Sequence, residues 1–354
     1  MEEEKIGNLS QKKYIILAAA LLVFLAGFIA LAVIFGGKKN PEAKYKDIYS
    51  PYLDGYFNAG PVRISDYSGL SDADFERAAV LADNTFNKFH RLFDIYNLYE
   101  GINNIKTIND NAGKNPVEID PELFEFLEFS KEMYHLTEGE VNIAMGAVLS
   151  IWHDYRAEGF GSALPDMAAL EAAAEHTDIE KLILDEENLT AYLSDGEMSL
   201  DVGAVAKGYA VEKTGELLSA EGYDSFLINA GGNIKILGEK PDGSSWKTGI
   251  KSPFEPDEVI FEFYLSSSSV ATSGGYERFY TVDGKRYHHI IDKETLMPAE
   301  NFASVSVITE NAALADTLST ALFNMTLEQG KALISSLENL RAIWVTHEGE
   351  IIEN

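Results

Sequence analysis

The stretch SLDVGAVAKGYA, Ser199–Ala210, runs from a predicted strand into a predicted helix through small residues. The start of a helix presents unpaired N–H groups and the positive end of the helix dipole, which suit phosphate. Gly203 and Ala204 let a ligand approach the backbone, and Lys207 adds a cation one turn into the helix. The order of residues matches neither a Walker loop nor a Rossmann glycine pattern. A small-residue helix packed tightly on a sheet explains the same stretch equally well.

Helices and short strands mix on both sides of this stretch. Helical spacing and caps predict helices at Ser71–Leu92, Pro121–Thr137, Leu164–Ala174, Val205–Ala220, Ala312–Met325 and Leu327–Leu337. Short apolar runs between turns predict strands at Leu182–Leu184, Thr190–Leu193, Met198–Val202, Phe226–Asn229, Ile234–Leu237, Lys247–Ile250, Ile260–Leu265, Phe279–Val282, Tyr287–Ile291, Ala303–Ile308, Ala342–Val345 and Glu350–Ile352. Asp283-Gly284 is typical of a hairpin turn. We expect an α+β fold: a single domain with a mixed, largely antiparallel sheet and packed helices.

The N-terminal region carries a long apolar run. No residue from Tyr14 to Phe35 is charged, and about 20 apolar residues suffice for a helix to cross a bilayer. The sequence therefore predicts a short cytoplasmic tail at 1–13, a transmembrane helix at 14–37, a tether at 38–49 and the domain at 50–354. Because the tail is so short, we expect the domain to be exported and to stay on the cell membrane. A cleaved signal peptide and a domain facing the cytoplasm are the alternatives.

The composition excludes some classes of protein. Lys and Arg number 28 against 57 Asp and Glu, which gives a net charge of -29. Proteins that bind nucleic acid carry basic patches, so we expect no nucleic-acid partner. The acidic balance also disfavours broad contact with anionic lipid. The chain has no cysteine, so it forms no disulfide.

Two further segments combine small residues with polar side chains. The paired glycines of Asn229–Gly232, between predicted strands, allow positive φ, although an ordinary turn also explains them. Thr272–Arg278 supplies hydroxyls that can donate to phosphate. His288 and His289 are adjacent in a predicted strand and so point to opposite faces, which disfavours joint metal binding. One of them, near Asp292, is a candidate acid or base; a partly buried strand histidine is the alternative.

A third segment, Ala315–Leu322, places Asp316 and Thr320 four residues apart in a predicted helix, hence on one face. A carboxylate and a hydroxyl are hard oxygen ligands suited to Mg²⁺ that bridges to phosphate. A capped helix start with Asp316 near its positive end is the alternative.

In their order along the chain, these segments resemble the ApbE family of FAD:protein FMN transferases. The resemblance extends from about Gly55 to Thr346. Its specific parts are Asp201–Ala210, Asn229–Gly232, Thr272–Arg278, His289–Asp292 and Ala315–Leu322.

The resemblance implies an enzyme that splits FAD, its substrate, at the pyrophosphate. It would transfer the FMN half to a Thr or Ser hydroxyl of a target protein as a phosphoester and release AMP, with Mg²⁺, or alternatively Mn²⁺, as the metal. The target would be another flavoprotein, such as a membrane redox subunit or an exported electron carrier, since Ser267–Thr272 lacks the acidic residue of family acceptor motifs.

The resemblance also assigns residues. It implies that the metal lies on Asp316, Thr320 and the backbone carbonyl of Ala204. His289, with Asp292 beside it, would be the base that takes the proton of the acceptor hydroxyl. The implied FAD contacts are Tyr96, Ala144, Met145, Gly146, Asp201, Lys207, Gly231, Gly232, Ser273 and Ile290.

The chain departs from the family pattern after Asp292. The family continues with Pro, a basic residue, Thr, Gly, any residue and Pro, whereas Lys293–Pro298 reads KETLMP. The missing Pro and Gly are expected to change a turn beside the site. Three other readings stay open: an FAD pyrophosphatase, a surface flavin-binding protein without catalysis, and an anchored solute-binding protein.

Overall fold

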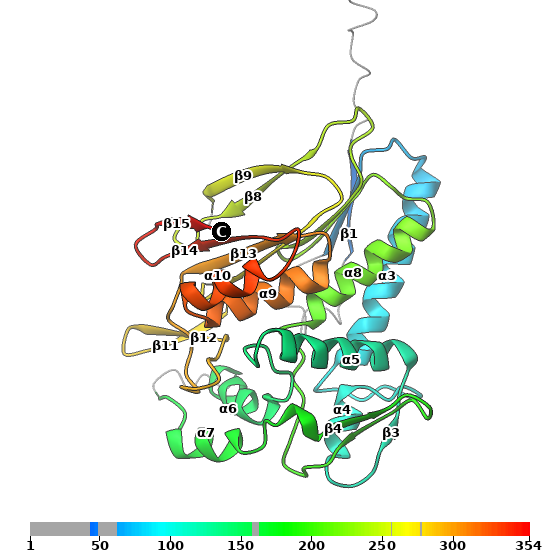
Figure 1. Ribbon diagram of the computed structural model, residues 1–354. Coiled ribbons are helices and arrows are strands. Elements are labelled where there is room, and N and C mark those ends of the chain that lie inside the picture. The colour runs from blue at the N-terminus through cyan, green and yellow to red at the C-terminus, as the bar shows by residue number, and fades with distance from the viewer. Residues whose placement is uncertain (1–42, 49–61, 158–162, 256, 277) are drawn as a thin grey trace, which may run out of the picture. The chain divides into compact units, whose positions relative to one another are not determined.

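An antiparallel sheet of eight strands organises the fold (Figure 1). In spatial order its strands are β1 (Lys44–Ile48), β2 (Val62–Asp66), β6 (Phe226–Ala230), β7 (Asn233–Leu237), β10 (Ser269–Gly274), β13 (Ser304–Thr309), β14 (Arg341–Val345) and β15 (Ile351–Glu353). Every neighbouring pair in this sheet is antiparallel. Together with the helices described next, it confirms the predicted α+β class with a largely antiparallel sheet.

The computed structural model describes residues 43–48, 62–157, 163–255, 257–276 and 278–354. Ala43–Asn354 form one compact unit. The predicted tail and membrane anchor, at 1–13 and 14–37, lie outside the described residues. In the predicted tether, at 38–49, Lys44–Ile48 form the edge strand β1. Within the described ranges, no helix combines the length and the apolar character needed to cross a membrane.

Helices cover one face of the sheet. On this side lie α3 (Asp72–Phe93), α8 (Ala206–Ala220), α9 (Ala312–Asn324) and α10 (Leu327–Ser335) (Figure 1). Helix α8 packs on β6 and β7, and α9 packs on β10 and β13. Ser71 caps α3 by accepting the Asp74 N–H, as the sequence predicts. Helix α8, in contrast, begins after Val205 without a side-chain cap, so its first turn is open to partners from other elements.

A hairpin covers the other face. It consists of β8 (Trp246–Lys251) and β9 (Val259–Leu265). One apolar cluster joins it to the sheet: Ile250, Phe263, Val270, Ile308 and Ile343. Their strand neighbours Ala271 and Val307 belong to the core under the helices. Because successive strand residues point to opposite faces, the hairpin and the helices sandwich the sheet.

The remaining elements lie beside the sheet and its helices (Figure 1). They are α4 (Ile105–Asp110), β3 (Val117–Glu118), α5 (Pro121–Leu136), α6 (Gly146–Ala157), α7 (Met167–Ala174), the 3₁₀ turn Ile179–Lys181, β4 (Leu182–Asp185), β5 (Thr190–Leu193), β11 (Phe279–Val282) and β12 (Lys285–His288). Asp283 and Gly284 have φ of 49° and 82°, which is the geometry of the predicted hairpin turn between β11 and β12.

Three local predictions differ from the structure. The predicted strand Met198–Val202 makes only an isolated bridge, Met145 to Ser199, because Asn109 bonds both the N–H and the carbonyl of Leu200. Helix α7 begins at Met167 rather than Leu164, since Asp166 caps it. Strand β12 ends at His288 rather than Ile291.

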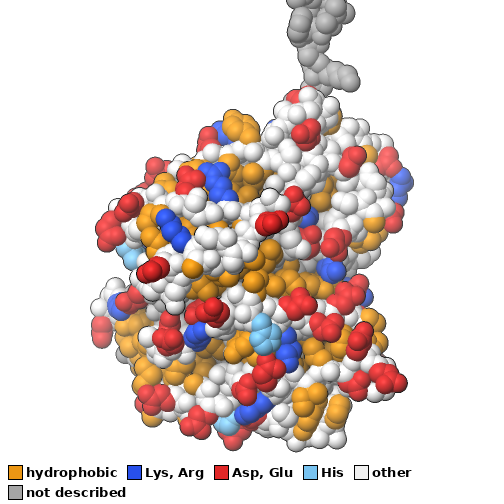
Figure 2. Space-filling view, in the orientation of Figure 1, with side chains coloured by type: hydrophobic (Ala, Val, Ile, Leu, Met, Phe, Trp, Pro, Cys, Tyr) orange, Lys and Arg blue, Asp and Glu red, His pale blue; other side chains and the backbone are white. Residues whose placement is uncertain are grey.

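The acidic composition is spread over the surface. In Figure 2, red carboxylate side chains appear over the whole visible face, and the blue Lys and Arg side chains lie between them without forming a large patch. On this face, therefore, the basic side chains do not form the kind of patch that is typical of nucleic-acid-binding proteins.

Candidate active site

A cavity of about 510 Å³ collects residues from segments far apart in the chain. Eleven of the residues that the family resemblance assigns line it: Tyr96, Met145, Asp201, Ala204, Lys207, Gly231, Ser273, His289, Ile290, Asp316 and Thr320. They come from the loop after α3, from the residue before α6, from the loop before α8 and the first turn of that helix, from the turn between β6 and β7, from β10, from the segment after β12, and from α9. The tertiary fold thus brings the separate sequence segments to one site.

The floor of the site is built where α8 and α9 approach each other closely. The Gly208 N–H donates to Asp316 Oδ2 at 2.8 Å. A Cβ atom on Gly208 would stand 2.4 Å from Asp316 Cβ and 2.5 Å from the Ala312 carbonyl oxygen, so this position admits only glycine. Asp316 is 4% exposed. The small-residue stretch therefore serves tight helix packing, and this packing places a buried carboxylate at the uncapped start of α8.

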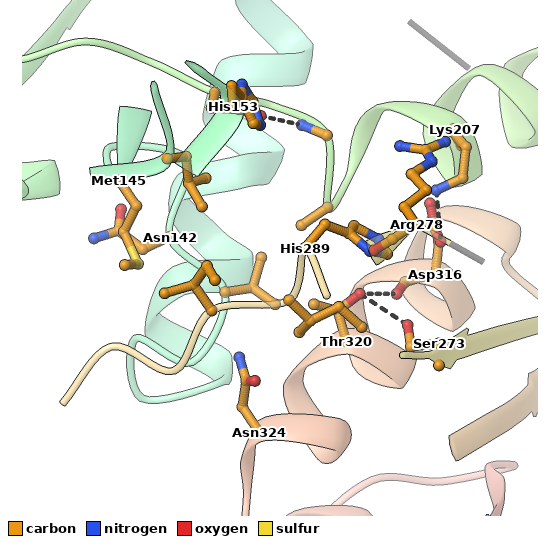
Figure 3. A pocket seen from close by; sticks show the side chains of 18 of the residues that line it. Asn142, Met145, His153, Lys207, Ser273, Arg278, His289, Asp316, Thr320 and Asn324 are labelled. Atoms are coloured by element: carbon orange, nitrogen blue, oxygen red, sulfur yellow. Dashed lines mark hydrogen bonds and ion pairs between the residues drawn. The ribbon is translucent and has the colours of Figure 1, made fainter. Parts of the chain in front are cut away.

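Hydroxyl groups continue the floor. Ser273 Oγ lies 2.8 Å from Ser319 Oγ and 3.0 Å from Thr320 Oγ1. Thr320 Oγ1 also donates to the Asp316 carbonyl at 3.3 Å. In Figure 3, dashed lines join the Thr320 hydroxyl to both Ser273 and Asp316. These contacts hold the Thr320 hydroxyl in place next to the Asp316 carboxylate.

The three predicted metal ligands, Ala204, Asp316 and Thr320, line the same cavity. Asp316 Oδ1 is 3.7 Å from Lys207 Nζ, longer than a hydrogen bond, so this oxygen keeps lone pairs for a cation. A carboxylate, a hydroxyl and a backbone carbonyl are the oxygen ligands that Mg²⁺ accepts, and the donor set fits that ion. Among the described residues, no group of three or more His, Cys, Asp and Glu side chains could hold a metal.

His289 lies at the centre of the site, between Arg278 and Thr320 (Figure 3). Its Nδ1 is 3.3 Å from the Arg278 carbonyl. A carbonyl only accepts, so Nδ1 carries the proton in the neutral ring and Nε2 keeps a free lone pair. Burial, together with the positive charges of Arg278 and Lys207, lowers the pKa of His289 to about 3. The ring is therefore neutral at physiological pH, as a general base must be.

The neighbouring His288 has a different environment. Its Nε2 donates to the Ala299 carbonyl at 2.8 Å, and its Nδ1 accepts the Ile290 N–H at 3.3 Å. Both ring nitrogens are thus engaged with the backbone, and His288 is not among the residues that line the cavity. The prediction that only one of the two histidines faces the site is confirmed.

Tyr96 stands at one edge of the cavity on a loop that Asp94 stabilises. Asp94 Oδ1 accepts the N–H groups of Tyr96 and Asn97 at 2.7 and 2.9 Å. The Tyr96 side chain is 57% exposed, and its hydroxyl lies 3.0 Å from His153 Nδ1. A well-anchored aromatic face is thus available to a planar ligand ring.

Four named residues do not line the cavity. Ala144 is fully buried. Gly146 begins α6 so close to Ser199 that a Cβ atom would lie 2.4 Å from its carbonyl oxygen. Gly232, with φ of 93°, completes the β6–β7 turn and donates its N–H to Asn229 Oδ1.

Asp292 is the fourth, and its carboxylate makes contacts within its own turn. Its Oδ1 accepts the N–H groups of Glu294 and Thr295 at 3.0 and 2.7 Å. These are contacts of a turn-capping carboxylate, and we assign Asp292 to the turn. The same turn puts Leu296 at φ of 57° where the resembled family has glycine.

Several polar residues line the cavity without having been singled out from the sequence, among them His153, Arg156 and Asn324. His153 Nε2 is 3.6 Å from Asp201 Oδ2. His153 and Arg156 are three residues apart on α6, which sequence periodicity did not predict as a helix. With α6 predicted, their shared face next to an expected FAD contact at Met145 would have pointed to them.

The chain is similar to known proteins of one family. The model of the ApbE family matches residues 62–344. The chain is 33% identical over 274 residues to the FAD:protein FMN transferase of Klebsiella pneumoniae (strain 342), which covers 77% of this chain and 84% of that protein. It is 34% identical over 260 residues to the FAD:protein FMN transferase of Treponema pallidum (strain Nichols), with 68% and 70% covered.

A solved structure has the same fold. The crystal structure of the ApbE protein of Thermotoga maritima MSB8 superposes with a TM-score of 0.77 at 28% identity, and the match covers 88% of this chain and 97% of that one.

Proposed function

The chain belongs to the ApbE family, and we propose that it transfers the FMN half of FAD to a Thr or Ser hydroxyl of an acceptor protein. The product is a phosphoester-linked flavin, and AMP is released. The observation that supports this reaction most strongly is the meeting of His289 with Asp316 and Thr320 in one cavity. Phosphoryl transfer needs a positioned nucleophile and neutralised phosphate oxygens, and these residues supply groups for both.

His289 prepares the nucleophile. The lone pair on Nε2 takes the proton of the acceptor hydroxyl, while the bond from Nδ1 to the Arg278 carbonyl keeps the ring in position. The hydroxyl oxygen forms a bond to the FMN phosphorus, and the bond from that phosphorus to the bridging oxygen breaks. The bridging oxygen leaves with AMP.

The floor of the cavity serves the pyrophosphate. Asp316, Thr320 and the Ala204 carbonyl are the residues that would hold Mg²⁺, whose contribution when bound is charge neutralisation on phosphate oxygens. Lys207 adds a fixed positive charge on the same side of the cavity (Figure 3). Tyr96 offers its exposed ring to a planar part of FAD.

The N-terminal apolar run gives the proposal a location. We propose that 14–37 anchors the chain in the cell membrane and that the domain lies outside the cytoplasm. An acceptor on the same membrane would then be held at high effective concentration. Such an acceptor is a membrane redox subunit or an exported electron carrier.

Co-expression with a candidate acceptor domain tests the reaction. We expect mass spectrometry to find one FMN phosphoester on a Thr or Ser of the acceptor, AMP in equal amount, and loss of both when EDTA removes Mg²⁺. Free FMN and AMP with an unmodified acceptor would instead indicate FAD hydrolysis. Flavin that is bound but intact would indicate a binding protein without catalysis.

A further inference from the structure

Arg156, in the last turn of α6, lines the cavity and is partly buried. In the described part of the chain, no hydrogen bond or ion pair engages its guanidinium. Five N–H donors in a partly buried cation are costly to leave without an acceptor. The chain has 57 acidic residues, so a carboxylate partner would have been easy to provide. An anionic ligand explains the arrangement better than packing does.

The surroundings of Arg156 narrow the position of this anion. Burial lowers the pKa of Arg156; among its neighbours, Tyr96 and the Asp201 carboxylate raise this pKa, whereas the positive charge of Arg278 lowers it, so the two guanidinium groups repel each other. The charges of Arg278 and Arg156 also act on His289, and so does that of Lys207. An anion placed among these three groups would remove the repulsion.

The reaction decides which anion fits. The acceptor hydroxyl that His289 activates must attack the phosphorus that stays with FMN, so this phosphate lies beside His289. The second phosphate leaves with AMP and belongs to the side of Lys207, Asp316 and Thr320. Arg156 lines the same cavity as His289 and as Tyr96, the exposed ring at its edge, and its charge acts on both.

On the basis of the proposed function, we propose that Arg156, together with Arg278, binds the phosphoryl group of the FMN half during transfer. The guanidinium fork donates two parallel hydrogen bonds to its oxygens, a geometry that a lysine cannot reproduce. Arg156 is thereby a residue that distinguishes the phosphorylated flavin from riboflavin.

Binding measurements without turnover test this assignment. Wild-type protein, R156Q, R156K and the surface control R77Q are titrated with FMN, riboflavin and AMP in EDTA, which removes any metal contribution. Arg77 is exposed on α3 and pairs with Asp74, so its loss should change nothing at the cavity. We expect R156Q to weaken FMN binding about tenfold or more while riboflavin and AMP binding stay unchanged. R156K should fall between wild type and R156Q.

Other outcomes overturn the proposal. If R156Q weakens riboflavin binding as much as FMN binding, Arg156 contacts the flavin ring. If R156Q weakens AMP binding, Arg156 contacts the phosphate that leaves with AMP. If R156Q binds FMN as tightly as the wild-type protein does, Arg156 does not bind the phosphate. If R156Q does not fold, R156K provides the test through the ratio of its FMN affinity to its riboflavin affinity. A ratio equal to that of the wild-type protein would contradict the proposal that Arg156 binds the phosphoryl group.

The acceptor assay separates this inference from the proposed function. If wild-type protein flavinylates the acceptor but binds FMN no more tightly than riboflavin, only the role of Arg156 is wrong. If no transfer occurs and FMN still distinguishes R156Q from wild type, the phosphate site stands and the transfer reaction is wrong.

Discussion

At the scale of single residues, two adjacent histidines have separate roles. His288 is tied to the backbone at both ring nitrogens, whereas His289 presents Nε2 to the cavity. We expect His289→Ala to lower the rate of flavin transfer about 10²–10⁴-fold, because the acceptor hydroxyl loses its base. FAD binding, measured by flavin fluorescence, should change little. Transfer at the wild-type rate would remove His289 from the mechanism.

The pH dependence of transfer follows from the lowered pKa of His289, about 3 against an ordinary 6.5. A base works only when unprotonated, so kcat/KM should stay nearly constant between about pH 7.5 and 5.5. With a base of ordinary pKa, kcat/KM would fall about tenfold for each pH unit below 6.5. If kcat/KM begins to fall near pH 6.5, His289 does not have the buried, positively charged environment that lowers its pKa.

The same shift has a consequence for stability. Below pH 6.5 the unfolded chain binds a proton at His289 that the folded protein binds only near pH 3. His289 therefore lowers the free energy of unfolding as pH falls through this window. His289→Ala should flatten part of that loss in urea unfolding.

Two opposing effects act at Leu296: backbone strain and burial of its side chain. Its φ of 57° costs about 1–2 kcal/mol for a side chain with Cβ. Its side chain, however, is 6% exposed and packs in the cluster around Trp152, and removing such a side chain costs about 2–5 kcal/mol. Burial outweighs strain, which explains how the turn tolerates leucine in place of glycine.

This balance predicts an unusual order of stabilities. Leu296→Ala loses the packing and keeps the strain, whereas Leu296→Gly loses both. We expect both variants to be less stable than wild type, with Gly more stable than Ala by about 1 kcal/mol in urea unfolding. The ordinary order, with Ala more stable than Gly, would show that the left-handed conformation carries no cost.

At the scale of elements, the α8–α9 contact both supports the fold and positions Asp316. In an ordinary helix, Gly→Ala adds about 1 kcal/mol of stability. At Gly208 the new Cβ would meet the Ala312 carbonyl oxygen at 2.5 Å, so we expect Gly208→Ala to destabilise the protein by about 1–3 kcal/mol instead. It should also raise the Mg²⁺ concentration needed for transfer, because Asp316 must shift.

Gly215 on the same helix is the matched control. There a Cβ would meet the side chain of Lys235 at 3.1 Å, so a shift of that side chain by a few tenths of an ångström relieves the contact, even though Glu212 holds its Nζ. Thermal unfolding of Gly215→Ala should therefore stay near wild type. An equal loss at both positions would show that the α8–α9 contact is not special.

At the scale of the whole molecule, we expect the proposed anchor to determine where the protein is located without being needed for flavin transfer. A chain that lacks residues 1–37 should leave the membrane fraction and still flavinylate a soluble acceptor, because β1 begins at Lys44 and remains intact. A reporter enzyme active only outside the cytoplasm, fused after Lys39, should be active. Activity of a cytoplasm-only reporter at the same position would contradict the orientation.

The sequence by itself determined features that depend on near neighbours in the chain. Ser71 capped the predicted helix α3, Asp283-Gly284 made the predicted hairpin turn, and Asp316 and Thr320 fell on one face of α9. Caps, turns and helical spacing are set by backbone geometry within about four residues, so a local pattern suffices. The ordered motifs also sufficed to identify the family.

Only the tertiary structure decided which of these residues meet. Strand β10, whose small and hydroxyl side chains carry little strand signal, forms because β7 and β13 pair with it on either side. Arg156 lines the cavity because α6 packs there. Asp292 does not line the cavity, and its carboxylate caps a turn. Such placements depend on contacts between segments distant in the chain, whose energies no local pattern contains.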